Sequence, residues 1–298
     1  MVNYSYTHLD QFFALSTWQK DVKGSFGLVP PPGDWEAFKR KIKSLNDACP
    51  PGETVKVIYA ARHGQAEHNV IGDKYGEAGQ MTYPILDPNL TALGRSQAFQ
   101  TRSSLKREYE KGMPLPQKWF VSPLKRAGET CGIEWGWLFH DNLNQMQDGQ
   151  GRWDAGKCHN VPAEVIENIR EHLHVHLCDS RCPITILKPQ FPSFVYPENM
   201  VDQDESWKPA EVRGRETEDE LVARRGEGIK EILEKSKDVT YISLTSHSGA
   251  LRGIYKSLNV PARSLVVAEM NVLVIRVKRS KSDKCRSVSD LIHKDRHL

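Results

Sequence analysis

The sequence predicts an α/β protein of three layers, in which helices cover both faces of a central sheet. Apolar runs typical of buried strands alternate along the chain with amphipathic patterns typical of helices. Reactive residues directly follow expected strands, which is where open α/β sheets hold their functional groups. With 298 residues, 39% of them hydrophobic, the chain is long enough for one large domain or two small ones, and we expect one that spans residues 1–298.

The first 53 residues are expected to form an ordered segment ahead of the core. They contain several aromatic side chains, including Trp18, and a break at residues 30–33. Asp34 is expected to begin a short basic helix that ends near Cys49, where two prolines and a glycine follow.

The core is expected to occupy residues 54–278, beginning with a strand at 54–61 that is apolar enough for burial on both faces. Thr91 is an N-cap candidate for a helix that runs towards Gly112. Residues 118–122 predict a strand, and Ser122-Pro123 predicts the start of a helix that reaches about residue 139. Alternating apolar residues at 163–170 predict another strand.

The second half of the core begins with a stretch rich in proline and aromatic residues, 183–209, which we interpret as a lid-like excursion over the sheet. A capping box at 217–220 predicts a helix with five inward apolar residues. These are Leu221, Val222, Ile229, Ile232 and Leu233. Residues 239–245 predict a strand, 248–258 a helix and 271–277 the last strand.

Composition limits the classes of protein that the chain can be. The mean hydropathy of −0.55 and the absence of any apolar run near ~20 residues argue against membrane association, and no secretory signal is visible at the N-terminus. We therefore expect a cytoplasmic protein, with the nucleus as a second location. The basic tail at 279–298 has no interleaved aromatic residues, so we interpret it as solvated and do not expect nucleic-acid binding.

The cysteines predict neither a disulfide framework nor a metal site. Six irregularly spaced cysteines are too few for a framework in a chain of this length, so we expect free thiols. Cys178 and Cys182 lie near three histidines, His172, His174 and His176. Their spacing is not that of a usual zinc pair, so neither a metal nor another cofactor is expected.

The segment Arg62-His63-Gly64 directly follows the first expected core strand. A neutral imidazole can attack phosphorus, a guanidinium can bind phosphoryl oxygens, and a glycine lets backbone approach a ligand. Taken alone, the tripeptide also fits a surface turn with a solvated arginine.

Three further segments occur in the order that the same chemistry requires: 90–98 opens a helix, 122–130 follows a strand, and 245–249 ends another. Together with Arg62-His63-Gly64 and Asn69, they closely resemble the signature of the histidine phosphatase superfamily, the phosphoglycerate mutase-like enzymes. The resemblance spans about residues 55–277 and implies a mixed, mostly parallel sheet.

The resemblance implies roles for five residues. His63 is the expected nucleophile, kept neutral by nearby cations, with its second ring nitrogen donating to a backbone carbonyl. Arg62 and Arg126 are expected to bind phosphoryl oxygens, His247 to supply a second imidazole, and Asn69 to donate its amide to the phosphoryl group.

A leaving alkoxide needs a proton, so a carboxylic acid with a raised pKa is expected in the site. In the acid phosphatase branch this acid follows the second histidine, where the present chain has Ser248. The other branch takes its acid from a Leu-Arg-Glu strand end, which Ile169-Arg170-Glu171 resembles. Glu171 is therefore the expected acid, and later the base that activates water, with Glu164 and Glu167 as alternatives.

The combination R-H-G-Q-x-x-H-N, D-P-x-L-T-x-x-G and C-D-x-R most resembles the fungal and plant phosphoglycerate mutase-like proteins. It implies a metal-independent hydrolase that acts on a small phosphomonoester through a phosphohistidine intermediate. A phosphomutase and a catalytically idle binding module of the same fold remain alternatives. Four arginines are candidates for contact with a second anionic group of the substrate: Arg170, Arg181, Arg213 and Arg215.

Overall fold

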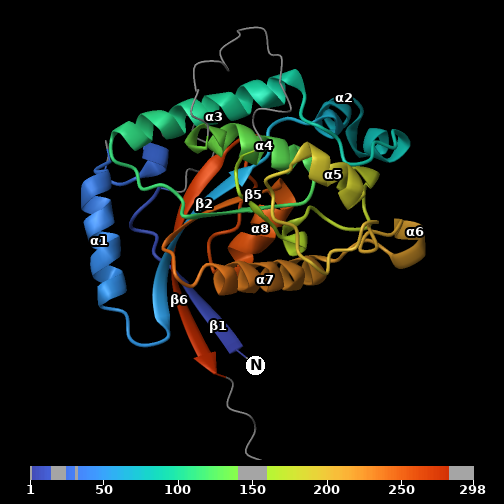
Figure 1. Ribbon diagram of the computed structural model, residues 1–298. Coiled ribbons are helices and arrows are strands. Elements are labelled where there is room, and N and C mark those ends of the chain that lie inside the picture. The colour runs from blue at the N-terminus through green and yellow to red at the C-terminus, as the bar shows by residue number, and fades with distance from the viewer. Residues whose placement is uncertain (1, 15–24, 31–32, 140–159, 282–298) are drawn as a thin grey trace, which may run out of the picture.

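A six-stranded sheet forms the centre of the computed structural model, which describes residues 2–14, 25–30, 33–139 and 160–281 (Figure 1). The strands are β1 (Val2–His8), β2 (Glu53–Arg62), β3 (Lys118–Val121), β4 (Glu164–Val165), β5 (Tyr241–Ser246) and β6 (Met270–Lys281). Their order is β1-β6-β2-β5-β3-β4. The β2–β5, β5–β3 and β3–β4 pairs are parallel, whereas β6 is antiparallel to both β1 and β2. The predicted mixed, mostly parallel sheet is confirmed.

Helices cover both faces of this sheet, as the three-layer prediction requires. The described helices are α1 (Trp35–Asp47), α2 (Glu67–Thr82), α3 (Ala92–Glu110), α4 (Lys125–Trp135), α5 (Ile184–Gln190), α6 (Ala210–Arg213), α7 (Glu218–Lys235) and α8 (Ser248–Ser257). In β2, Val57 and Tyr59 belong to a core shared with α1, α3 and α4. Ile58 and Ala60 belong to a second core shared with α7 and α8, on the opposite face (Figure 1).

Helix starts follow the predicted capping residues. The Asp34 side chain accepts a hydrogen bond from Ala37 N at the start of α1, and Thr91 accepts one from Gly94 N at the start of α3. Thr217 and Glu220 form the predicted capping box of α7. Of the five residues expected to face inward from α7, four are buried and Val222 is half-buried.

Two predicted element boundaries in the middle of the chain are wrong. The helix expected from Ser122-Pro123 begins at Lys125, because Leu124 keeps an extended backbone (ψ 137°) and serves as the N-cap. The strand expected at 163–170 is limited to the two residues of β4, and a short 3-10 turn, Glu167–Ile169, follows. Of the alternating apolar residues in that segment, Ala163 and Val165 pack in the core on the α4 face, and Ile169 packs with α7 and α8 after the strand has ended.

The N-terminal segment supplies a strand that the sequence did not predict. β1 pairs with the whole second half of β6, from Val2 opposite Lys281 to His8 opposite Ile275. The last strand therefore continues past the expected end at 277 into the residues assigned to the basic tail. Residues 282–298 and Trp18 lie outside the described residues.

The first part of the 183–209 stretch, which was expected to be a lid-like excursion, packs into the core, whereas residues 195–209 are exposed or half-buried. It begins with α5, whose Leu187 is fully buried, and Phe191 and Phe194 are also buried in the core on the α4 face. Phe191 lies so close to Gly128 of α4 that a Cβ atom there would be 2.8 Å from the ring. Burial of Phe191 and Phe194 explains the aromatic residues in the first part of this stretch.

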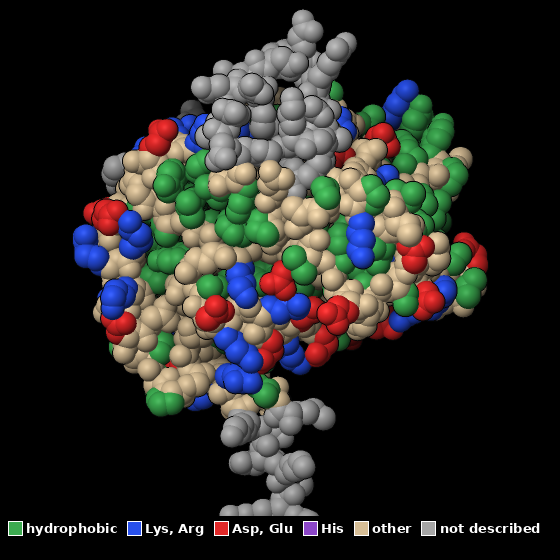
Figure 2. All heavy atoms as spheres, in the orientation of Figure 1, with side chains coloured by type: hydrophobic (Ala, Val, Ile, Leu, Met, Phe, Trp, Pro, Cys, Tyr) green, Lys and Arg blue, Asp and Glu red, His purple; other side chains and the backbone are tan. Residues whose placement is uncertain are grey.

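The surface shown in Figure 2 carries basic and acidic side chains interspersed, without a basic stripe of the kind that nucleic acids bind. Within the described part of the chain, no helix is both long and apolar enough to cross a bilayer.

Candidate active site

The candidate site lies where three adjacent parallel strands end. His63 follows β2, His247 follows β5 and Ser122 follows β3. Backbone hydrogen bonds continue the sheet to these residues, from His63 N to Ser246 O (3.0 Å) and from Ser122 N to Thr245 O (3.0 Å). The two imidazole rings are consequently 5.1 Å apart between centroids. The carboxyl edge of the sheet brings the predicted histidines together.

The ring of His63 is oriented by its own loop. Its Nδ1 lies 2.7 Å from the carbonyl oxygen of Gly64, and since a carbonyl only accepts, Nδ1 carries the proton. The unprotonated Nε2 is then the nucleophilic atom of the neutral ring. This is the backbone partner that the sequence analysis expected.

Gly64 also has a packing role that was not predicted. A Cβ atom at this position would lie 2.4 Å from the carbonyl oxygen of Gly94, and one at Gly94 would lie 1.9 Å from Gln65 O. The two glycines let the start of α3 pack directly on the loop that holds His63.

His247 is fully buried, and its Nε2 lies 2.7 Å from the hydroxyl oxygen of Ser122. Its Nδ1 is buried without a hydrogen-bond partner among the described residues. Ser122, expected to cap a helix, therefore orients the second imidazole and leaves Nδ1 for a ligand.

Burial and positive charge keep both histidines neutral. Burial lowers the pKa of His63 well below its usual range, and the charges of Arg126 and Arg62 lower it further. The pKa of His247 is also well below its usual range, because of burial first and Arg126 second. The third ring, His68, lies 5.6 Å from His63, and its pKa is lowered for the same reasons.

Arg126 is buried in the site, but Asp179 and the backbone hold its guanidinium. Its Nη2 is 2.7 Å from Asp179 Oδ1, and its Nη1 donates to Cys178 O at 2.6 Å. The remaining nitrogen, Nε, is buried without a partner among the described residues. Asp179 was not predicted as a site residue, although the C-D-x-R motif contains it.

Arg62 is partly buried and keeps one donor unpaired. Its Nη1 donates to Leu265 O at 2.6 Å, whereas Nε is buried with no partner in the described part of the chain. Burial lowers the pKa of Arg62 somewhat, and the charge of Glu171 opposes that effect.

Glu171 reaches the site, but its pKa moves opposite to the prediction. Its Oε2 accepts a hydrogen bond from Gly249 N (2.9 Å), and its Oε1 lies 3.1 Å from His172 Nδ1. Burial alone would raise the pKa of Glu171, but the hydrogen bond with His172 and the charges of His172 and Arg225 hold it well below its usual range. The expected raised pKa is therefore wrong for the unliganded site.

Asn69 and Glu171 line one cleft, together with His68, Gln80, His172, Val175, His176, Cys178, Asp179, Arg215 and Glu216. Asn69 Oδ1 accepts from Ala66 N at 2.9 Å at the start of α2, and Asn69 Nδ2 lies 3.1 Å from His68 Nε2. The amide that was expected to donate to phosphate thus also fixes the start of a helix.

The alternative acids and the arginines predicted to contact a second anion have partners of their own. Glu164 pairs with Lys235 at 3.0 Å and Glu167 pairs with Arg170, and neither glutamate lines the cleft. The four arginines proposed for a second anion all have partners. Arg170 pairs with Asp204, Arg181 donates to Val201 O, Arg213 pairs with Glu220, and Arg215 pairs with Glu77. Of these four, Arg215 lines the cleft.

One set of described residues has the ligand types of a metal site. His176, Cys178 and Asp179 place their ligand atoms within 4.8 Å of one another. Asp179 already binds the guanidinium of Arg126, whose charge repels a cation, and burial raises the pKa of the Cys178 thiol. These residues fit a metal ion poorly. Cys178, Cys182, Cys49 and Cys131 are free thiols, while Cys158 and Cys285 lie outside the described residues.

Comparisons with known proteins identify the family of the chain. Residues 58–150 match the family model of the histidine phosphatase superfamily (branch 1). A phosphoglycerate mutase-like protein 1 of Arabidopsis thaliana is 32% identical over 67% of this chain and 71% of its own length. A probable phosphoglycerate mutase of Saccharomyces cerevisiae is 29% identical over 78% and 82%.

A third relative, a probable phosphoglycerate mutase of Arthroderma benhamiae, is 28% identical over 83% of this chain and 71% of its own length. The resemblance read from the four motifs, the mixed sheet and these relatives agree: the chain belongs to the histidine phosphatase superfamily, among its phosphoglycerate mutase-like members.

Proposed function

We propose that the protein hydrolyses small phosphomonoesters through a phosphohistidine on His63 and needs no metal ion. The observation that carries the proposal is the state of the His63 ring, which is neutral and held by the 2.7 Å contact of Nδ1 with Gly64 O. A buried imidazole fixed in this tautomer presents Nε2 as a nucleophile at neutral pH.

In the first step, His63 Nε2 attacks phosphorus, the bond from phosphorus to the ester oxygen breaks, and the alcohol leaves with a proton. Arg62, Arg126 and His247 would stabilise the phosphoryl oxygens, since each has a buried nitrogen that lacks a partner within the described residues. These donors would supply the charge stabilisation that a metal ion supplies in other phosphatases.

Glu171 is the proposed proton donor in spite of its low pKa in the unliganded site. An arriving phosphomonoester brings about two negative charges next to this carboxylate, and like charge raises a carboxyl pKa. Asp179 is a second candidate, because burial raises its pKa even though Arg126 opposes that shift. In the second step the resulting carboxylate takes a proton from water, which attacks phosphohistidine and releases phosphate.

A phosphomutase shares the first step and differs in returning the phosphoryl group to substrate. The names of the fungal relatives, probable phosphoglycerate mutases, make this the alternative to test. Phosphate release and phosphoglycerate interconversion, measured on the same preparation, separate the two activities.

The test is a His63→Ala variant assayed in EDTA against a panel of phosphomonoesters. We expect a loss of at least ~10³-fold in kcat with unchanged folding, because a nucleophile acts as part of a unit. His8→Ala, in β1 and away from the cleft, is the matched control and should keep full activity. Turnover near the wild-type rate in His63→Ala, or a requirement for added metal in the wild type, would contradict the proposal.

A further inference from the structure

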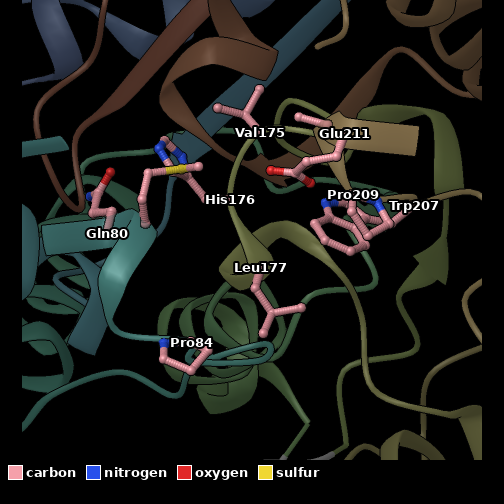
Figure 3. A pocket seen from close by; sticks show the side chains of 10 residues that line it. Gln80, Pro84, Val175, His176, Leu177, Trp207, Pro209 and Glu211 are labelled. Carbon is pink, nitrogen blue, oxygen red and sulfur yellow. The ribbon is translucent and has the colours of Figure 1, made fainter. Parts of the chain in front are cut away.

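A second pocket adjoins the catalytic cleft and has no part in the chemistry described so far. Three segments form it: the end of α2 with Pro84, residues 175–177, and residues 207–211 at the start of α6. Figure 3 shows Trp207 and Pro209 on one side, Gln80 on the opposite side, and Leu177 and Pro84 along the lower edge.

This pocket is continuous with the cleft. Gln80, Val175 and His176 line both. His176 stands between them, with Nδ1 4.0 Å from Asp179 Oδ2 on the cleft side. His63 does not itself line the cleft, but His68 does, and its ring lies 5.6 Å from the ring of His63. A substrate that reaches His63 through the cleft could therefore extend into the pocket past the three shared residues.

The lining is largely apolar and carries no positive charge. Seven of its ten residues have apolar side chains, and neither lysine nor arginine occurs among the described residues that line it. Glu211 supplies its one carboxylate, which has no hydrogen-bond or ion-pair partner within the described residues. Arg215, the cation that lines the cleft, is paired with Glu77 at 3.0 Å. A second phosphate or carboxylate would meet no free cation here, and it would meet repulsion from Glu211.

The size and shape of this second pocket suit a substrate group with a single ring. The cavity volume is about 130 Å³, close to the ~150 Å³ of an engineered apolar cavity that holds benzene. Trp207 offers an indole face for stacking. Two polar atoms of the lining residues, Trp207 Nε1 and His176 Nε2, are buried without a hydrogen-bond partner in the described chain, so a heteroatom on the ring has partners available.

We propose that this pocket, which we call the ring pocket, receives the alcohol part of the substrate, and that the preferred alcohol carries one uncharged six-membered ring and no second anionic group. The inference rests on the proposed function, because it treats the ring pocket as the leaving-group side of the same site. The inferred preference is for ring-bearing phosphomonoesters over compact phosphomonoesters that carry a second anionic group, such as phosphoglycerates.

Binding of phosphonates tests the ring pocket independently of turnover, since their carbon–phosphorus bond is not hydrolysed. Isothermal titration calorimetry compares ethyl, phenylethyl and phenylbutyl phosphonate, the two phenyl compounds covering two lengths of linker. Wild type is expected to bind the better phenyl compound at least ~10-fold more tightly than ethyl phosphonate, since burying a ring contributes that much. Trp207→Ala should reduce this preference to less than ~3-fold while ethyl phosphonate binds as before.

A charge variant keeps the test decisive if Trp207→Ala fails to fold. Glu211→Lys should improve binding of carboxyphenylethyl phosphonate at least ~5-fold relative to phenylethyl phosphonate, because it replaces repulsion by attraction. Glu205→Lys makes the same charge change on an exposed residue outside the ring pocket and should leave the ratio unchanged.

The outcomes separate this inference from the proposed function. If Trp207→Ala abolishes the ring preference but no ester releases phosphate, the ring pocket is supported and the proposed hydrolase activity is contradicted. If esters release phosphate but no ring preference is found, the hydrolase activity is supported and the ring pocket is contradicted. An equal response of Glu211→Lys and Glu205→Lys, or equal losses for ethyl and phenyl compounds in Trp207→Ala, would overturn the ring pocket.

Discussion

Replacing Asp179 by asparagine should destabilise the protein strongly, because it removes the charge that compensates a buried arginine. The side chains of Arg126 and Asp179 are 0% and 4% exposed, and Nη2 lies 2.7 Å from Oδ1. Removing one partner of such a pair leaves an uncompensated buried charge, which typically costs ~3–5 kcal/mol. Asparagine retains a hydrogen-bond acceptor, so we expect the lower end, about 3 kcal/mol.

The assay is equilibrium unfolding in urea, with Glu77→Gln as the matched control. That change breaks the Arg215–Glu77 pair, whose side chains are 56% and 61% exposed, and exposed pairs contribute only ~0–1 kcal/mol. Inorganic phosphate should stabilise Asp179→Asn more than wild type, because the uncompensated charge of Arg126 attracts the anion and an anion that binds only the folded state raises its stability. A loss below about 1 kcal/mol in Asp179→Asn would refute the claim that this ion pair compensates the buried charge of Arg126.

Three further predictions concern the pH dependence of stability, the role of Glu171 as the acid, and the close packing of Gly249 against Glu171. The unfolded chain takes up protons on His63 and His247 below about pH 6.5 while the folded site stays neutral, so the free energy of unfolding should fall by ~1.4 kcal/mol per pH unit for each; urea titrations at successive pH values check this, and a flat profile from pH 6.5 to 5 would contradict it. Glu171→Gln should slow alkyl phosphates far more than p-nitrophenyl phosphate, whose leaving group needs no proton; equal losses in kcat would move the acid to Asp179. Gly249→Ala would place a Cβ 2.3 Å from Glu171 Oε1, so kcat should fall at least ~10-fold. Gly226→Ala, with its nearest neighbour at 3.9 Å, should not change kcat, and an equal effect of the two substitutions would count against the argument.

The parts of the fold that were predicted correctly are those with a strong local pattern, either a long apolar run or a helix-capping residue. The apolar run of β2 and the caps at Thr91 and Thr217 lie where the sequence placed them. The 163–170 segment misled because alternation of apolar residues also arises when a turn packs against helices. β1 was missed although Val2, Tyr4 and Tyr6 alternate with polar residues, because its pairing with β6 is a contact between chain ends that no local pattern encodes.

The same division holds in the candidate site. His63 and His247 were predictable because both follow strands, and strand ends meet at one edge of the sheet. The contacts of Asp179 with Arg126 and of Ser122 with His247 join residues 53 and 125 positions apart, which no local pattern encodes. The low pKa of Glu171 depends on Gly249 and His172 converging on one carboxylate, and only the folded structure reveals that arrangement.

The position of β2 in the sheet also determines when this strand can fold during synthesis of the chain. This strand is synthesised early, yet both of its neighbours, β5 and β6, come from the last third of the chain. At ~5–20 residues per second, the ribosome needs on the order of ten seconds or more to deliver them. Until then both edges of the apolar β2 segment are unpaired. Chaperones bind such exposed segments, and at high expression the segments aggregate. Slower synthesis would lengthen this exposure, so lowering the temperature during production should help less than co-expressing a chaperone that holds nascent chains.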